Sequence, residues 1–219
     1  MLLAAGCGNS RTYEGDAKTI LREAKQAVDS ASALHFSLES SDVHGGSGPM
    51  ITGGQGDAKR PDGFAGSLHV SVGGLPLSVN IVSINGSFYA SALGAPYSKA
   101  DPSKYGFADP SKLIDPNVGL TNLLISAKSA SLGDRDRLGN DELYEIDVSL
   151  PGDQVKSLLT SADPSQDVKG RVGVNVDNHQ VRRVVLTGPF FDAKQLSTFT
   201  LVLDNYGENV TITPPAGSG

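Results

Sequence analysis

The chain has 219 residues, a length that suits one large domain or two small ones. Its 24 Asp and Glu outnumber its 18 Lys and Arg, so the formal net charge is -6, and no basic run occurs. A nucleic-acid partner is therefore not expected, because binding to a phosphate backbone requires a positive face. No apolar run approaches the roughly 20 residues of a transmembrane helix. Short runs of Val, Leu, Ser and Thr between Gly, Asn and Asp indicate a β-rich chain.

The only cysteine, Cys7, follows a short stub of apolar and small residues. The stub, Leu3-Ala4-Ala5-Gly6-Cys7, loosely fits a bacterial lipobox, in which small residues precede the cysteine that is lipidated. The polar stretch from Gly8 to Gly15 then predicts a tether. We expect residues 1–15 to be a signal-peptide remnant, lipobox and tether. The alternative is a cysteine without a role in a frayed N-terminus.

Residues 16–32 form the clearest predicted helix, and Asp16 is placed to cap it. Apolar side chains recur along it at helical spacing and form one stripe. They are Ile20, Leu21, Ala24, Ala27, Val28 and Ala31. The stripe requires a large apolar surface against which to pack.

Alternating apolar and polar residues predict strands at 34–38, 68–72 and 77–81. Between them, residues 53–56 read Gly-Gly-Gln-Gly, which lacks the third glycine of a dinucleotide-binding loop and precedes no helix. This short stretch predicts a turn or a bulge.

The dipeptide Asn85-Gly86 predicts a two-residue hairpin turn. Such a turn places Ile81 opposite Ala90, and it puts Phe88 on the apolar face of the preceding strand. The other face of this hairpin is mostly polar. The pattern is typical of an antiparallel sheet with one apolar and one solvated side.

Asp-Pro pairs mark predicted helix starts in the middle of the chain. We expect a short turn from Pro110 and a helix from Pro116 to about Ala127, with Leu120, Leu123 and Leu124 on its apolar face.

Strands are predicted again in the second half of the chain, with a short helix over 152–159. The strand segments are 129–135, 142–150, 172–176, 181–187, 199–203 and 210–213. Residues 214–219 are rich in Pro and Gly and are expected to be disordered. The predicted helices are too few to cover such a sheet tightly, so the sheet either curls on itself or encloses something.

Motifs of catalysis are lacking: there is neither a nucleophile elbow nor a phosphate-binding loop. The four histidines lie far apart in the sequence with no partner at helical spacing, so no metal site and no cofactor are predicted. Two pairs of carboxylates are interpreted as parts of a charged outer face: Asp134 with Asp136, and Glu142 with Glu145. We expect that the protein is not an enzyme.

Four stretches together resemble the mycobacterial lipoprotein family that includes LppX, LprA, LprF and LprG. They are the stub ending in Cys7, INGSFYA (84–90), LIDPNVGLTNLL (113–124) and LDNYGENVTITPP (203–215). Two features depart from the family pattern. Tyr206 stands where a Trp is usual, and the strand at 172–176 lacks the common Val-Trp-Ile.

The resemblance implies an α+β fold, in which a strongly curved antiparallel β half-barrel has helices over its concave face. Such a fold, similar to that of the LolA and LolB carriers, encloses an apolar cavity. Residues 16–213 would then be a single lipid-binding domain. The implied protein is a monomeric envelope lipoprotein, lipid-anchored on the extracytoplasmic side of the cell membrane.

The implied cargo is an acylated lipid or glycolipid, of the phospholipid, phosphatidylinositol mannoside, lipoglycan or triacylglycerol class. It would be carried towards the outer envelope, with a lipid exporter as a candidate partner. The alternative is a scaffold or adhesin lipoprotein that has a packed core and transports nothing.

The expected lipid-binding residues are the apolar side chains on the concave faces of the predicted strands and on the predicted helix at 116–127. They are Phe36, Leu38, Leu68, Val70, Val72, Leu77, Val79, Ile81, Phe88, Leu120, Leu123, Leu124, Tyr144, Ile146, Val148, Val174, Leu186, Phe199 and Leu201.

Overall fold

The computed structural model describes residues 14–43 and 48–216. Within these ranges, twelve strands form one antiparallel sheet in the order β6-β5-β4-β3-β2-β1-β12-β11-β10-β9-β7, and β8 pairs with β9. Cys7, most of the predicted tether, and residues 217–219 of the predicted tail lie outside the described residues.

The strands of the first half are β1 (Ala33–Ser41), β2 (Met50–Lys59), β3 (Gly63–Val72), β4 (Leu75–Ile84), β5 (Ser87–Ala92) and β6 (Ser98–Lys99). Those of the second half are β7 (Ser129–Leu132), β8 (Asp136–Leu138), β9 (Asp141–Leu150), β10 (Val168–Asn175), β11 (Val181–Asp192) and β12 (Gln195–Asp204). The helices are α1 (Glu14–Ser30), α2 (Leu120–Ile125) and α3 (Gly152–Lys156), with the 3-10 helices η1 (Pro102–Tyr105) and η2 (Pro110–Lys112).

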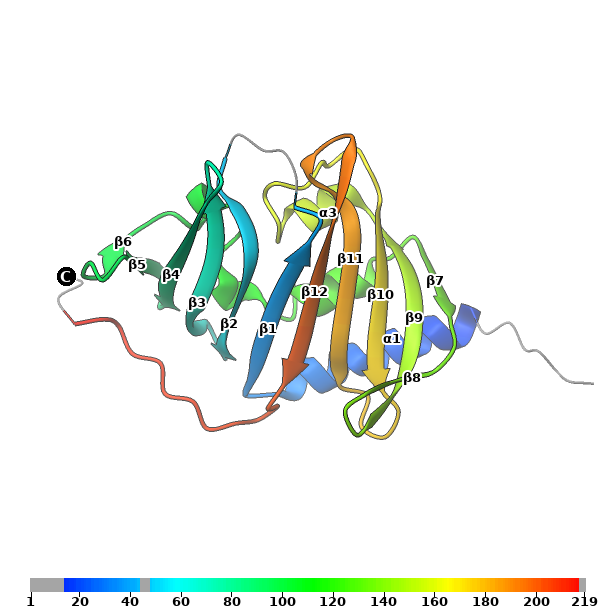
Figure 1. The fold of residues 1–219 in the computed structure, drawn as a ribbon. Helices are drawn as coiled ribbons and strands as arrows, with labels where there is room; N and C mark the ends of the chain where they lie inside the picture. The colour runs from blue at the N-terminus through cyan, green and yellow to red at the C-terminus, as the bar shows by residue number, and fades with distance from the viewer. Residues whose placement is uncertain (1–13, 44–47, 217–219) are drawn as a thin grey trace, which may run out of the picture.

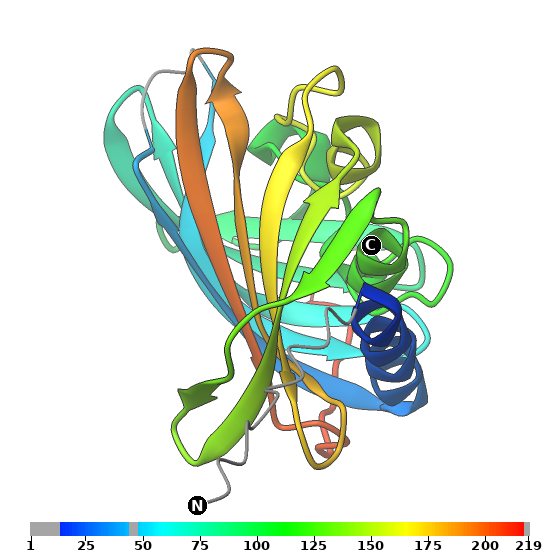
Figure 2. The same ribbon diagram turned by 90° about the vertical axis from the view of Figure 1, so that its right-hand side faces the viewer.

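The sheet is strongly curved, and the helices lie on its concave side. Figure 1 looks onto the convex face of the sheet, with α1 passing behind the strands. Figure 2, turned by 90°, shows α1 and the shorter helices on the inner side of the bend. The two ends of the sheet, β6 and β7, do not pair with each other, so the sheet is an unclosed half-barrel. The predicted fold class is confirmed.

The apolar stripe of α1 is buried as expected, with Ala24 and Val28 both 1% exposed. It packs on β7, β10, β11 and α2. The helix starts at Glu14, two residues earlier than predicted. Asp16 therefore lies inside the first turn and not in the capping position.

The predicted hairpin is confirmed between β4 and β5. Ile84 pairs with Ser87 and Ile81 pairs with Ala90. Asn85 and Gly86 both have positive φ angles, of 53° and 68°, as a type I′ turn requires.

The predicted helix over 116–127 is shorter in the structure, where α2 spans only Leu120–Ile125. Asp115 instead caps an isolated turn, since its Oδ1 accepts the backbone N–H groups of Asn117 and Val118. The chain then passes through Gly119, where a Cβ would lie 2.5 Å from two backbone carbonyl oxygens. This crowded turn separates the Asp-Pro start from the helix.

Other predictions also differ from the structure. Residues 53–56 form the middle of β2, with a bulge between Ile51 and Gly53. These glycines permit a close approach, because a Cβ on Gly56 would lie 2.5 Å from the Ala65 carbonyl oxygen of β3. The short helix α3 ends at Lys156, and residues 210–213 form no strand.

The convex face holds one buried charge that was predicted to be exposed. Glu145 is 4% exposed, and its Oε1 accepts a hydrogen bond of 2.6 Å from Arg183. Arg183 also donates to Asp136 of β8 at 2.6 Å. The β8 hairpin thus helps to cover Glu145, an arrangement that alternation along β9 does not reveal.

Candidate functional site

A cavity of about 140 Å³ lies between the middle of the sheet and the short elements that cover it. The sheet supplies residues from β1, β2, β3, β11 and β12, and the cover supplies residues from η2, α2 and the region of α3. The lining residues are Phe36, Leu38, Ile51, Phe64, Leu68, Phe107, Ala108, Asp109, Pro110, Leu113, Leu120, Leu123, Val155, Leu158, Leu159, Val184, Leu186, Phe199 and Leu201.

The cavity lies between two well-filled parts of the concave face. On the side of β9 and β10, Ile146, Val172 and Val174 are fully buried beneath α1 and its neighbours. On the side of β5, Phe88 packs against Tyr105 and Phe107, with ring centroids 6.2 and 6.1 Å apart. Between them, the cover consists of short helices and the loops that join them.

The lining is apolar except at one position. Asp109 is the only charged residue among those that line the cavity, and its Oδ1 accepts the backbone N–H of Ser111 at 3.0 Å. That carboxylate caps η2, so it is already engaged in shaping the cover. Such a lining is suited to burying hydrocarbon without directional contacts.

Eight of the nineteen predicted lipid-binding residues line this cavity. They are Phe36, Leu38, Leu68, Leu120, Leu123, Leu186, Phe199 and Leu201. They alternate with polar neighbours along their strands or share one face of α2, which is the pattern that identified them.

The other eleven predicted residues lie outside the lining. Seven are buried in the continuous apolar core, namely Val70, Val79, Ile81, Phe88, Ile146, Val148 and Val174, and Leu124 of α2 is buried with them. Leu77 and Tyr144 pack on the edge of that core, and Arg135 lies 4.9 Å from the centre of the Tyr144 ring. Val72 is 46% exposed at the tip of the β3–β4 hairpin, beyond the reach of the cover.

The lining also contains residues that the periodicity did not identify. Most come from the cover, where Phe107 to Asp109 form the loop before η2 and Leu158 and Leu159 follow α3. The Ala108 N–H donates to the Leu158 carbonyl at 3.1 Å, which joins these two parts of the cover. In the sequence, the apolar pair Leu158-Leu159, which follows the polar residues of the short helix, was the signal that could have identified this part of the lining.

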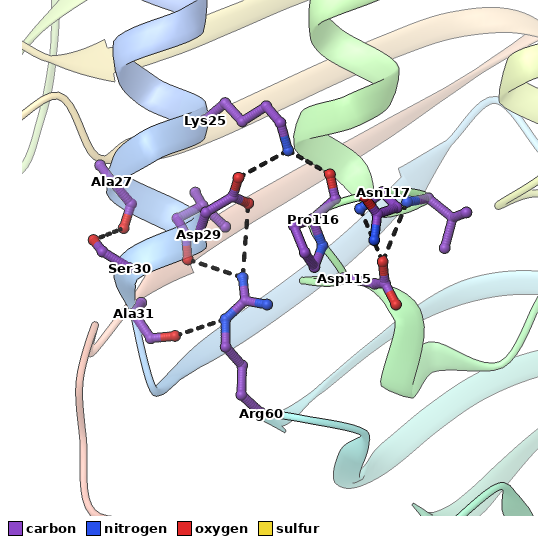
Figure 3. Close-up of polar contacts among 11 residues, drawn as sticks. Lys25, Ala27, Asp29, Ser30, Ala31, Arg60, Asp115, Pro116 and Asn117 are labelled. Carbon is purple, nitrogen blue, oxygen red and sulfur yellow. Dashed lines mark hydrogen bonds and ion pairs between the residues drawn. The ribbon is translucent and has the colours of Figure 1, made fainter.

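Polar contacts fasten the cover to α1 at one end (Figure 3). Lys25 forms an ion pair of 2.8 Å with Asp29 and donates to the Pro116 carbonyl at 2.5 Å. Arg60, which follows β2, donates to the Ala31 carbonyl at 3.0 Å. Lys25 is thus the side chain that joins α1 to the turn leading into α2 in this cluster.

No helix in the described ranges is long and apolar enough to cross a membrane.

Comparisons with known proteins agree with this architecture. A family model described as LppX_LprAFG lipoprotein matches residues 16–212. Lipoprotein LprA of Mycobacterium tuberculosis is 28% identical, over 92% of this chain and 82% of its own length. The lipoarabinomannan carrier protein LprG of the same species is 22% identical, over 97% of this chain and 89% of its own length.

Two crystal structures share the fold. That of LprF from Mycobacterium bovis has a TM-score of 0.74 at 15% identity and covers 94% of this chain and 100% of its own. That of the Mycobacterium tuberculosis lipoprotein LppX has a TM-score of 0.67 at 14% identity, with 91% and 100% covered.

Proposed function

Because the chain belongs to the LppX_LprAFG lipoprotein family, we propose that it carries acylated lipids or glycolipids within the cell envelope. The observation that supports this function is the apolar cavity between sheet and cover, which would shield an acyl chain from water. A relative that is named a lipoarabinomannan carrier adds weight to a lipoglycan or another acylated glycolipid as the cargo.

The energetics of transfer favour a lining of this kind. An acyl chain with ~15 methylenes gains roughly 12 kcal/mol on leaving water, at about 0.8 kcal/mol per CH₂. A bilayer offers the same gain, so a carrier has only to match the membrane in order to exchange lipid with it. An apolar lining with little polar specificity meets that requirement.

The size of the cavity implies that the cover moves when lipid binds. At about 140 Å³ the cavity is smaller than typical ligand pockets of about 300–1,000 Å³. It accommodates part of one chain as it stands. The short elements η2 and α3 are the parts of the cover that would shift, since α1 packs on β7, β10 and β11 and also holds α2.

We further propose that Cys7 carries the lipid anchor and holds the protein on the extracytoplasmic side of the cell membrane. Two or three acyl chains on one cysteine anchor stably, whereas a single chain binds marginally. The folded domain would then act as a monomer at the end of its tether and receive cargo from, or deliver it to, an envelope lipid exporter.

Organic extraction followed by mass spectrometry tests the carrier function. The protein is purified from a mycobacterial host after removal of its own anchor by the Cys7→Ala change, and the extract is compared with that of an unrelated protein purified in parallel. A stoichiometric acylated species found only with this protein is expected. An empty extract favours a scaffold or adhesin with a packed core.

A further inference from the structure

A second cluster of polar side chains lies on the convex face, on the opposite side of the sheet from the cavity. Phe36 of β1 lines the cavity, so its neighbour His35 points to the other face. His35 pairs with Asp57 of β2 on one side and with Asp204 of β12 on the other. Glu208 is contributed by the C-terminal segment, residues 205–216, which follows β12.

The potential ligand atoms of this cluster converge. His35 Nδ1 lies 2.6 Å from Asp57 Oδ1. The atoms offered by His35, Asp57 and Glu208 all lie within 4.8 Å of one another. All three side chains are half-buried.

The negative charge of the cluster is only partly compensated. Three carboxylates surround one imidazole, and both Asp204 Oδ1 and Glu208 Oε1 are shielded from solvent without a hydrogen-bond partner. Desolvation and the charge of Asp57 raise the pKa of Glu208. Lys59, two residues from Asp57 on β2, is engaged elsewhere, since it donates to the Val210 carbonyl.

We propose that His35, Asp57 and Glu208 bind a divalent transition-metal cation, with Zn²⁺ as the best match. One imidazole nitrogen and two carboxylate oxygens are ligands of zinc, and a water would complete the coordination. A tetrahedral zinc ion with bonds of about 2.1 Å separates its ligand atoms by roughly 3.4 Å. The separations in the structure lie on both sides of this value, from 2.6 Å for His35 Nδ1 and Asp57 Oδ1 up to a limit of 4.8 Å. Binding therefore requires the side chains to rotate and the hydrogen bond between His35 and Asp57 to open.

The ligands come from three separate segments, so a bound ion would join them. His35 and Asp57 belong to adjacent strands, and Glu208 belongs to the C-terminal segment. Other contacts of that segment include the Tyr206 hydroxyl, which donates to the Val181 carbonyl at 2.6 Å, the Gly207 N–H, which donates to the Ala33 carbonyl at 2.8 Å, and the contact of Lys59 with Val210. The site is independent of the cavity and of the proposed carrier function.

Isothermal titration calorimetry with ZnCl₂ tests the proposal on the full chain after treatment with a chelator. One saturable site is expected in the wild type. Both His35→Ala and Glu208→Gln should weaken its affinity for Zn²⁺ by more than ~10-fold. Glu208→Gln keeps the shape of the side chain, and circular dichroism verifies that each variant is folded.

His179→Ala is the matched control, because His179 faces a single carboxylate, that of Glu23, at 3.3 Å. This variant should retain the affinity of the wild type. MgCl₂ serves as a second control, since Mg²⁺ prefers six oxygen ligands and should bind far more weakly. The proposal is overturned if Zn²⁺ shows no saturable binding at millimolar concentration, or if its affinity is the same in all three variants.

Discussion

Replacing a cavity-lining leucine by tryptophan distinguishes an open site from a packed core. Leu68 of β3 is 4% exposed and lines the cavity of about 140 Å³. A cavity of about 150 Å³ engineered in another protein accommodates benzene. The cavity therefore has room for most of the ring that Leu68→Trp adds, and we expect a loss of less than ~1 kcal/mol in the free energy of unfolding.

Ile146→Trp is the control, because Ile146 is fully buried on the same concave face but lies outside the lining. Overpacking a filled site costs about 1–3 kcal/mol or more. In a chain of this length, each kcal/mol lowers the melting temperature by roughly 2–4 °C. Ile146→Trp should therefore melt several degrees below Leu68→Trp.

The assay combines thermal unfolding with extraction of bound lipid. Leu68→Trp should lose most of its lipid and keep nearly all of its stability, because the indole occupies the space of the acyl chain. Ile146→Trp, where it remains folded, should retain lipid. Equal losses of stability in the two variants would refute the open site, as would wild-type amounts of lipid in Leu68→Trp.

Three further variants test the anchor, the fastening of the cover and the buried charge. Cys7→Ala should move the protein from the membrane fraction to the soluble fraction without changing its melting temperature; retention after a high-salt wash would contradict the anchor. Lys25→Ala should lower the free energy of unfolding by about 1–2 kcal/mol, because the Pro116 carbonyl loses a charged donor. Lys18 is exposed, so Lys18→Ala should change the free energy of unfolding by no more than ~0.5 kcal/mol in the same thermal scan. Arg183→Met should lower the free energy of unfolding by about 3 kcal/mol or more, because Glu145 is left buried and unpaired. The control is Arg171→Met, which breaks the exposed pair with Asp147. If Arg183→Met loses no more stability than this control, the Glu145 carboxylate finds another partner.

The strand periodicity predicted the sheet well because half-buried antiparallel strands impose a period of two on the sequence. It missed β2, since Gly53, Gly54 and Gly56 carry no side chain to display an alternation. Those glycines are required by the close approach to β3, which is a property of the neighbouring strand. A pattern read along one segment does not contain that information.

The candidate site was predicted only in part, and the reason is related. Alternation shows which face of a strand is apolar, but it does not show what covers each part of that face. Val79 and Leu68 are register partners on one face, yet only Leu68 reaches the cavity lining. The convex cluster was missed because His35 and Asp57 are distant in sequence and meet only through strand pairing.

The lengths of the covering elements explain why the gap lies where it does. The 17 residues of α1 extend about 25 Å, enough to cross roughly five strands spaced about 4.8 Å apart. The six residues of α2 extend only about 9 Å. One long helix can therefore fill only part of a sheet of twelve strands, and short elements joined by loops must cover the remainder. Because loops present few apolar side chains at regular spacing, they fill the concave face less completely than a long helix, and the cavity forms beneath them.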